Sequence, residues 1–281
     1  MISIDRLRRP AIACAIGLLI GTSAATAAED ASRWDGDVRS AVRLIAGSQP
    51  AGAAIIRAGI EFKLKPGWHT YWRYPGDAGV PPRFDFQGSK NVKAVEVLWP
   101  APQRIPEAGM IAIGYSSGLV LPLQITPQDR GKPVTLRLKL DYAVCEKLCV
   151  PAEAKVELVV AGRTSSHEAA LAAAEARVPR KVALGEGGTL AIRSVRRDDG
   201  AVPPRILVDV AGPPGTDLFA EGPTPEWALP LPALMAGAPA PLHRFAFAPD
   251  GAPPGTKFQG AQLRFTAVAG PEAIEVVTRL D

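Results

Sequence analysis

Residue types that build many functional sites are scarce in this chain, which has 3 cysteines, 3 histidines and 3 methionines among 281 residues. It also lacks a glycine-rich phosphate loop, a G-x-S-x-G elbow and an H-E-x-x-H motif. These absences argue against nucleotide-binding, serine hydrolase and metallopeptidase functions. Lysine and arginine outnumber aspartate and glutamate by only 32 to 28 and are spread along the chain. A nucleic-acid-binding face, which needs clustered basic residues, is therefore not expected.

Long apolar runs are also missing, except at the amino terminus. Three arginines in MISIDRLRRP precede an apolar stretch at 11–24, and Ala25-Thr26-Ala27 resembles a cleavage site. This pattern predicts a secretory signal peptide at 1–27 and a periplasmic protein. Removing it takes three arginines and one aspartate from the totals of 32 and 28, which leaves a net charge of +2. Cys14 lies inside the signal peptide, and nothing later approaches the roughly 18 apolar residues of a membrane span.

Apolar and polar residues alternate in many short stretches. Alternation with a period of two residues predicts half-buried β-strands, and many such strands between Pro/Gly turns predict an all-β sandwich. The clearest runs have the apolar members Ile56, Ala58, Ile60, Phe62 and Leu64; Val134, Leu136, Leu138, Leu140, Tyr142 and Val144; and Ala154, Val156, Leu158 and Val160.

One helix is predicted between two sets of strands. The alanine-rich stretch 165–179 begins with Ser165 and Glu168, which fit a capping box, and ends at Pro179. Beyond it, TLAIRSV, RILVDVA, HRFAFA, AQLRFTAV and AIEVVTRL again read as strands. We therefore expect four parts: a signal peptide at 1–27, a β-sandwich carrying the cysteine pair at 28–162, a helical connector at 163–186, and a second β-sandwich domain at 187–281.

The two cysteines outside the signal peptide lie in DYAVCEKLCVP, residues 141–151. If their flanking strands form one hairpin closed by loop 146–148, Cys145 lies opposite Cys149. Opposed residues on antiparallel strands have Cα atoms about 4.5–5.5 Å apart, which a disulfide can span. Because the cysteines alternate with the apolar residues, both are predicted to point away from the core, toward solvent.

The same hairpin register also places other residues of the two strands opposite each other, and the character of these pairs tests the register. Four of them join apolar residues, as one buried face requires. Arg137 opposite Glu157 is favourable, whereas Lys139 opposite Lys155 counts against the register. The four apolar pairs are Leu140 with Ala154, Leu138 with Val156, Leu136 with Leu158, and Val134 with Val160.

A disulfide across so short a loop restricts the unfolded chain little, and its exposure leaves it open to thiol attack. Lys147 favours the thiolate form, while Glu146 opposes it. Cys149 is the expected exposed cysteine, because Pro151 cannot donate to a strand ladder. Three interpretations stay open: a redox-active pair, a structural staple, or a metal site. In the last, Cys145 and Cys149 bind copper(I) together with His69 or a methionine.

Aromatic residues cluster in PGWHTYWRYPGDAGVPP, residues 66–82. One interpretation places Trp68 and Trp72 in the sandwich core. The other is an aromatic shield or docking surface beside the cysteines. Its members are His69, Tyr71, Trp72, Tyr74 and Asp77.

GWHTYWRYPGDAGVPP and DYAVCEKLCVP together resemble the periplasmic amino-terminal region of the DsbD/ScsB family of thiol:disulfide interchange proteins, over residues 35–160. DLFAEGPTPEWALPLP, residues 217–232, is similar to the second module of the ScsB-type branch. The resemblance implies an immunoglobulin-like β-sandwich whose redox pair matches Cys145 and Cys149, with no cofactor. Such modules take electrons from a membrane-embedded domain and a thioredoxin-like domain and pass them to periplasmic oxidoreductases.

The cysteines are closer together than in the best-known member of the family, and no multi-span domain or C-x-x-C motif follows them. We therefore expect a free-standing electron relay that does not span the membrane or bind nucleic acid. Its donor would be a membrane carrier of the DsbD or CcdA type or a thioredoxin-like domain, and its client a periplasmic oxidoreductase. The alternatives are a periplasmic copper-binding or copper-tolerance protein and a non-catalytic β-sandwich adaptor with a structural disulfide.

Overall fold

The computed structural model describes residues 29–280, except for 51, 78 and 162–163. The predicted signal peptide, including Cys14, lies outside the described residues. Within the described part of the chain, no helix has both the length and the apolar composition needed to cross a membrane.

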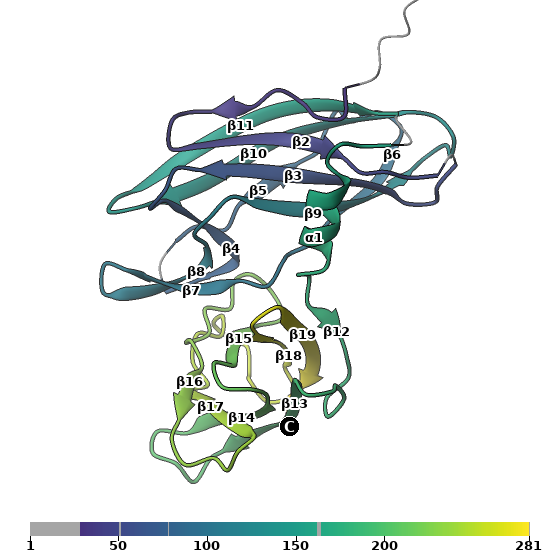
Figure 1. The fold of residues 1–281 in the computed structure, drawn as a ribbon. Coiled ribbons are helices and arrows are strands. Elements are labelled where there is room, and N and C mark those ends of the chain that lie inside the picture. Colours follow the sequence, from purple (N-terminus) through teal and green to yellow (C-terminus); the bar gives the residue numbers. More distant parts are fainter. Residues whose placement is uncertain (1–28, 51, 78, 162–163, 281) are drawn as a thin grey trace, which may run out of the picture.

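The first half of the chain forms two antiparallel sheets around one core, which confirms the all-β prediction (Figure 1). One sheet has the strand order β1-β2-β3-β9-β6; the other has the order β11-β10-β4-β8-β7, with β5 paired to β10. The strands are β1 (Asp35–Gly36), β2 (Ser40–Ala46), β3 (Ile56–Leu64), β4 (His69–Gly76), β5 (Arg83–Asp85), β6 (Val92–Val97), β7 (Gln103–Glu107), β8 (Met110–Tyr115), β9 (Leu119–Pro127), β10 (Val134–Cys145) and β11 (Cys149–Val160).

The second half forms two further sheets, of four strands each, around a core of its own. Their orders are β12-β19-β18-β15 and β13-β14-β17-β16. The five runs predicted as strands in this half form β13, β14, β17, β18 and β19, one strand each. The strands are β12 (Arg180–Lys181), β13 (Ala191–Asp198), β14 (Arg205–Ala211), β15 (Asp217–Glu221), β16 (Ala233–Met235), β17 (Leu242–Phe247), β18 (Gln262–Ala269) and β19 (Glu272–Arg279). The protein is therefore all-β, of the immunoglobulin-like sandwich class.

The hairpin of β10 and β11 has the predicted register at every pair, from Val134 opposite Val160 to Cys145 opposite Cys149. Its leucine face is buried in the first core. Lys139 does lie opposite Lys155, but Glu153 separates their charges, with its carboxylate 3.2 Å from Lys139 Nζ and 2.6 Å from Lys155 Nζ. The like-charge pair is thus compensated by a neighbouring acid on the same strand.

The helix α1 (Glu168–Glu175) is shorter than predicted, and the predicted capping box is wrong. His167 is the N-cap residue and makes no side-chain cap. The Ser165 hydroxyl donates to the Ala46 carbonyl. Glu168 turns outward instead, accepting from the Ser48 backbone N–H at 2.7 Å and from Arg57 at 2.8 Å. The side chains of Ser165 and Glu168 therefore bond to residues of the first sandwich and do not form the reciprocal backbone bonds of a capping box.

Helix α1 packs on the first sandwich along its apolar side. Leu171 is fully buried, and one of its methyl carbons approaches Gly47 so closely that a Cβ there would clash, while its other methyl would lie 3.2 Å from a Cβ at Gly59. At the polar edge, Arg57 donates to Glu168 and also forms a two-pronged ion pair with Glu175. The helix is thus attached to the first sandwich by both apolar contacts and charge.

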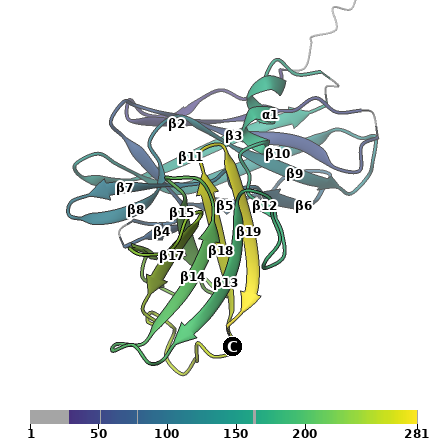
Figure 2. The same cartoon turned by 60° about the horizontal axis from the view of Figure 1, so that its bottom comes forward.

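The two sandwiches contact each other through β4, β7 and β15. Figures 1 and 2 show the second sandwich lying against the side of the first that carries β4, β7 and β8. Arg73 of β4 donates to both oxygens of Glu221 in β15, at 2.7 and 2.8 Å. Arg104 of β7 binds Asp217 at 2.9 Å. Phe219 packs into the first core, so the interface combines apolar and ionic contacts.

All four tyrosines have pKa values above the ordinary range, chiefly because burial disfavours the phenolate; that of Tyr74 is raised to about 12. A pKa higher in the folded than in the unfolded chain stabilises the fold fully below the unfolded value of about 10, and this contribution disappears as pH rises through the folded value. We expect the free energy of unfolding, measured by urea titration, to fall between about pH 10 and 12. Tyr115→Phe should reduce that slope. A flat profile to about pH 12 in the wild type would contradict the expectation.

Candidate functional site

Cys145 and Cys149 form a disulfide at the turn end of the β10–β11 hairpin, with their Cα atoms 4.2 Å apart. The intervening loop, Glu146 to Leu148, is exposed. Cys149 is exposed as well, but Cys145 has only 1% of its surface accessible, so the prediction that both face solvent is wrong for Cys145. Strand alternation tells which face of the hairpin carries a residue, and here other strands of the same sheet cover that face.

The cover over Cys145 comes from β4, β7 and β8. Tyr71, Ala112 and Ala143 form a small apolar cluster with Cys145, and Ile105 packs against it. This cluster is separate from the main sandwich core. The disulfide is therefore half enclosed, with one sulfur atom in a packed pocket and the other at the surface.

Strand β4 brings His69 and Tyr71 to the disulfide. His69 lies directly opposite Cys145 in the ladder and is 4% exposed. The Tyr71 hydroxyl lies 3.2 Å from Cys149 Sγ. The two rings meet edge to face, with centroids 5.6 Å apart. Two predicted site residues are thus placed beside the cysteines by strand pairing.

Glu107 is the residue of this site that the sequence analysis missed. Its Oε1 lies 2.8 Å from Cys149 Sγ and 3.1 Å from Cys145 Sγ. Its Oε2 lies 2.9 Å from His69 Nε2, and the Tyr71 hydroxyl donates to the carboxylate at 3.1 and 3.2 Å. One carboxylate therefore joins both sulfur atoms, the imidazole and the phenol.

Glu107 reaches the sulfur atoms because it ends β7 at a tight turn. The next two residues, Ala108 and Gly109, both have positive φ angles, of 49° and 85°. This is the conformation of a two-residue hairpin turn whose twist matches the flanking strands. A signal was available in the sequence, because Glu107 is the sole charged residue between Arg104 and Asp129.

The hydrogen-bonding capacity of this cluster depends on the redox state. Disulfide sulfur atoms carry no proton, whereas the two thiols of the reduced form can each donate to Glu107. The pKa of Tyr71 is raised well above its ordinary value by burial, and further by the charge of Glu107 and the hydrogen bond to it. Tyr71 consequently stays a neutral donor at physiological pH. The arrangement suits a disulfide whose reduction is coupled to nearby proton-binding groups.

Three other predicted residues lie elsewhere. Trp72 is fully buried in the first core, with its ring 5.9 Å from that of Phe219. The Tyr74 hydroxyl donates to the Leu229 carbonyl in the second half of the chain. Asp77 is exposed at the end of β4. Of the five predicted members of the aromatic shield, only His69 and Tyr71 therefore lie at the disulfide itself.

Lys147, the remaining predicted residue, is exposed in the hairpin loop. It forms no ion pair within the described residues. In the chain it lies two residues before Cys149.

Ligand atoms of a possible metal site also meet here. His69, Glu107 and Cys145 each offer one, all within 4.8 Å of one another. In the reduced form the two thiolates would suit a soft cation, while the imidazole accepts either a soft or an intermediate one. The residues present therefore fit a metal only when the disulfide is open.

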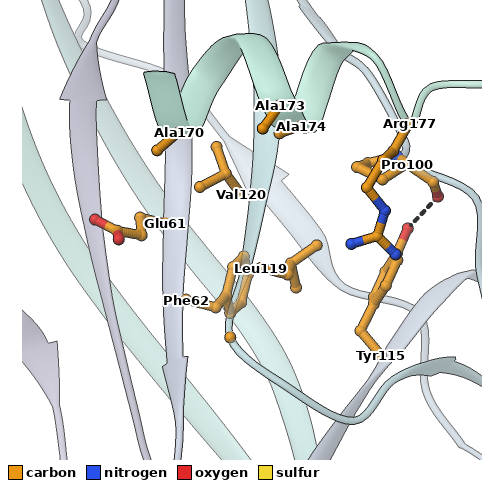
Figure 3. Close-up of a pocket in the computed structure, with 11 residues that line it drawn as sticks. Glu61, Phe62, Pro100, Tyr115, Leu119, Val120, Ala170, Ala173, Ala174 and Arg177 are labelled. Carbon is orange, nitrogen blue, oxygen red and sulfur yellow. Dashed lines mark hydrogen bonds between the residues drawn. The ribbon is translucent and has the colours of Figure 1, made fainter. Parts of the chain in front are cut away.

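A hollow of about 360 Å³ lies under α1, between the helix and strands β3 and β9 (Figure 3). Figure 3 shows its mainly apolar wall, with the Tyr115 hydroxyl donating to the Pro100 carbonyl at 2.7 Å. None of the residues that line it belongs to the disulfide cluster. We assign it no part in the chemistry of the cysteines.

The site can now be compared with known proteins. Residues 42–161 match the family described as "Thiol:disulfide interchange protein DsbD, N-terminal". They form a domain of the DsbD amino-terminal type.

The N-terminal periplasmic domain of ScsB from Proteus mirabilis has a similar crystal structure. The similarity covers 89% of this chain and 98% of that one, with a TM-score of 0.70 and 20% sequence identity. At this identity it shows a shared fold, and the fold extends over both sandwiches. No curated protein sequence matches the chain.

Replacing Glu107 by glutamine keeps the side-chain size and removes the negative charge beside the sulfur atoms. A nearby negative charge disfavours the thiolate, which is the reactive form. We expect reduced Glu107→Gln to react with iodoacetamide roughly tenfold faster at neutral pH than the wild type, equivalent to one unit of thiol pKa. Glu146→Gln, in the exposed loop, is the matched control and should change the rate less than about twofold. An unchanged or slower rate in Glu107→Gln would refute a direct effect of this carboxylate.

Proposed function

We propose that this protein is a periplasmic thiol–disulfide relay, which accepts electrons at Cys145–Cys149 and passes them to other proteins. The observation that carries the proposal is the unequal exposure of the two sulfur atoms within one cluster of proton-binding groups. Cys149 Sγ is open to attack, whereas Cys145 is enclosed beside Glu107 and His69. A disulfide used only as a staple has no need of such neighbours.

Reduction follows from thiol–disulfide exchange chemistry. A donor thiolate attacks Cys149 Sγ, a new donor–Cys149 bond forms, and the Cys145–Cys149 bond breaks. Cys145 leaves with the electron pair as a thiolate. The second donor thiolate then attacks the donor sulfur of the mixed disulfide, which releases Cys149 and leaves the donor oxidised. Two electrons have moved, and two protons from solvent restore the thiols.

The cluster gives the buried thiolate a route to a proton. Cys145 Sγ is 3.1 Å from Glu107 Oε1, and the other oxygen of that carboxylate is 2.9 Å from His69 Nε2. A proton shared by Glu107 Oε2 and His69 Nε2 is therefore one carboxylate group away from the leaving sulfur. Delivery reverses the chemistry: the Cys149 thiolate attacks a client disulfide, and Cys145 resolves the mixed disulfide.

The surface around Cys149 supports contact with a partner protein. Leu148, the residue before Cys149, is 74% exposed, and Val80 is 54% exposed, so apolar surface is available to a partner. A groove of about 570 Å³ is lined by residues that include Val80, Ala143 and Pro151. We propose that a thioredoxin-like donor, or a membrane carrier of the DsbD or CcdA type, and a periplasmic oxidoreductase client use this surface in turn.

Single cysteine replacements test the relay. Excess reduced thioredoxin should reduce the oxidised wild-type protein. The reduction is measured by alkylating the free thiols and comparing gel mobility. Cys145→Ser should leave a Cys149 thiolate that attacks the disulfide of an oxidised client and stays in the mixed disulfide, because the resolving thiol is missing, whereas Cys149→Ser should trap far less. Because the closed loop is short, both variants should lose little stability in urea.

The double variant Cys145→Ser/Cys149→Ser is the control and should trap nothing. If wild-type protein stays oxidised against excess thioredoxin, the bridge is a structural staple and the relay is refuted.

Copper binding is a second candidate, favoured by the meeting of His69, Glu107 and Cys145 atoms within 4.8 Å. Reduced Cys145 and Cys149 with His69 would give copper(I) two thiolates and an imidazole, ligands that it prefers. Titration of the reduced protein with copper(I) against a competing chelator tests this. One equivalent should bind, and Cys145→Ser should abolish it. Saturation of the chelator before the protein binds any copper would exclude this function.

A further inference from the structure

Strand β4 has two ends with different partners. At its start, His69 and Thr70 pair with β10, and Thr70 and Tyr71 pair with β8. The pairing with β8 then becomes irregular and resumes only at Gly76. Among the described residues, the intervening stretch 72–75 has no ladder partner on either side, so the sheet alone holds it weakly.

Side-chain hydrogen bonds to the second sandwich hold this stretch instead. Arg73 donates to both oxygens of Glu221 and to Glu275 at 2.6 Å. The side chains of these acids are only 13% and 6% exposed. The Tyr74 hydroxyl, in turn, donates to the Leu229 carbonyl. The segment that follows the two redox-site residues of β4 is thus anchored in the other sandwich.

Strand β7 shows the same division. It is an edge strand, paired only with β8. Glu107 at its end contacts both sulfur atoms. Three residues earlier, Arg104 binds Asp217 and also donates to the carbonyls of Leu218 and Pro232, at 3.0 and 2.7 Å. Both strands that carry groups to the disulfide are therefore tied to the second sandwich.

We propose that the second sandwich is a positioning element of the redox site, which acts through Arg73 and Arg104 to hold Glu107, His69 and Tyr71 against the cysteines. An edge hairpin without lateral support would let Glu107 move away from the sulfur atoms. Three residues of strand span about 10 Å, so a shift at Arg104 reaches Glu107 along one stiff segment. The second sandwich in this way tunes the reactivity of a disulfide that it does not touch.

The proposal rests on the proposed function only in requiring that the disulfide be reducible. Two variants test it from opposite sides of the interface: Arg104→Met in β7, and Glu221→Gln in the second sandwich. Each is made alone and combined with Glu107→Gln. The readouts are the iodoacetamide rate of the reduced protein at neutral pH and the equilibrium of the disulfide with glutathione. Neither readout needs a protein partner, so failure of the relay would be seen separately.

Both variants should raise the alkylation rate, as Glu107→Gln does, by about threefold or more, the low end of coupling between groups in contact. Both should also shift the glutathione equilibrium. In the Glu107→Gln background the further change should vanish, because the group being positioned is then no longer charged. If Arg104→Met does not fold, Glu221→Gln still decides the question.

Arg244→Met is the matched control. Arg244 forms a two-pronged ion pair with Asp209 inside the second sandwich, at 2.6 and 3.0 Å, and pairs with nothing in β4 or β7 within the described residues. It should leave both readouts at wild-type values. The proposal is overturned if Arg244→Met shifts them as much, if neither test variant shifts them, or if their effect persists in full without the Glu107 charge.

Discussion

The register of the β10–β11 hairpin is the constraint on which both the core and the disulfide site depend. Turning on three residues brings Cys145 opposite Cys149, and the same alignment places Leu136, Leu138 and Leu140 on the buried face. A slip of one residue would turn those leucines outward and separate the cysteines. The free energy of burying the leucine face therefore also holds the two sulfur atoms at bonding distance.

The unequal environments of the two cysteines arise from neighbouring strands rather than from the hairpin. Strand β4 places His69 beside Cys145, and the β7–β8 turn places Glu107 against both sulfur atoms. Cys149 begins the edge strand β11 and stays exposed. One sulfur is thereby enclosed and the other accessible, which matches the roles that the proposed relay gives them.

The contacts between sandwiches give the second half of the chain a physical connection to this chemistry. Arg73 and Arg104 are two-pronged donors, and a planar guanidinium fixes orientation as well as distance. Their acidic partners Glu221 and Asp217 stand at the two ends of β15, with Phe219 between them packed into the first core. The similar fold of the ScsB domain spans both sandwiches as well. The pair of sandwiches is thus better regarded as one structural unit than as a redox domain with an appendage.

Most of the strands, and the hairpin with its complete register, could be predicted because they depend on alternation within a dozen residues. The helix was located correctly, but its cap was not, since Arg57 and Ser48 compete for Glu168 from more than a hundred residues away. Glu107 could have been noticed as the one charge in an apolar stretch. Its role could not be assigned, because nothing local relates β7 to the cysteines.

The sequence by itself determined the strand pattern, the pairing of Cys145 with Cys149 and the resemblance to a thiol–disulfide interchange domain. Only the tertiary structure decided that Cys145 is enclosed, that Glu107 joins His69 and Tyr71 at the sulfur atoms, and that Trp72 belongs to the core. The physical reason is that side-chain alternation is a property of a single strand. The order of strands in a sheet depends instead on the burial of surfaces far apart in the chain, and that order determines which side chains meet.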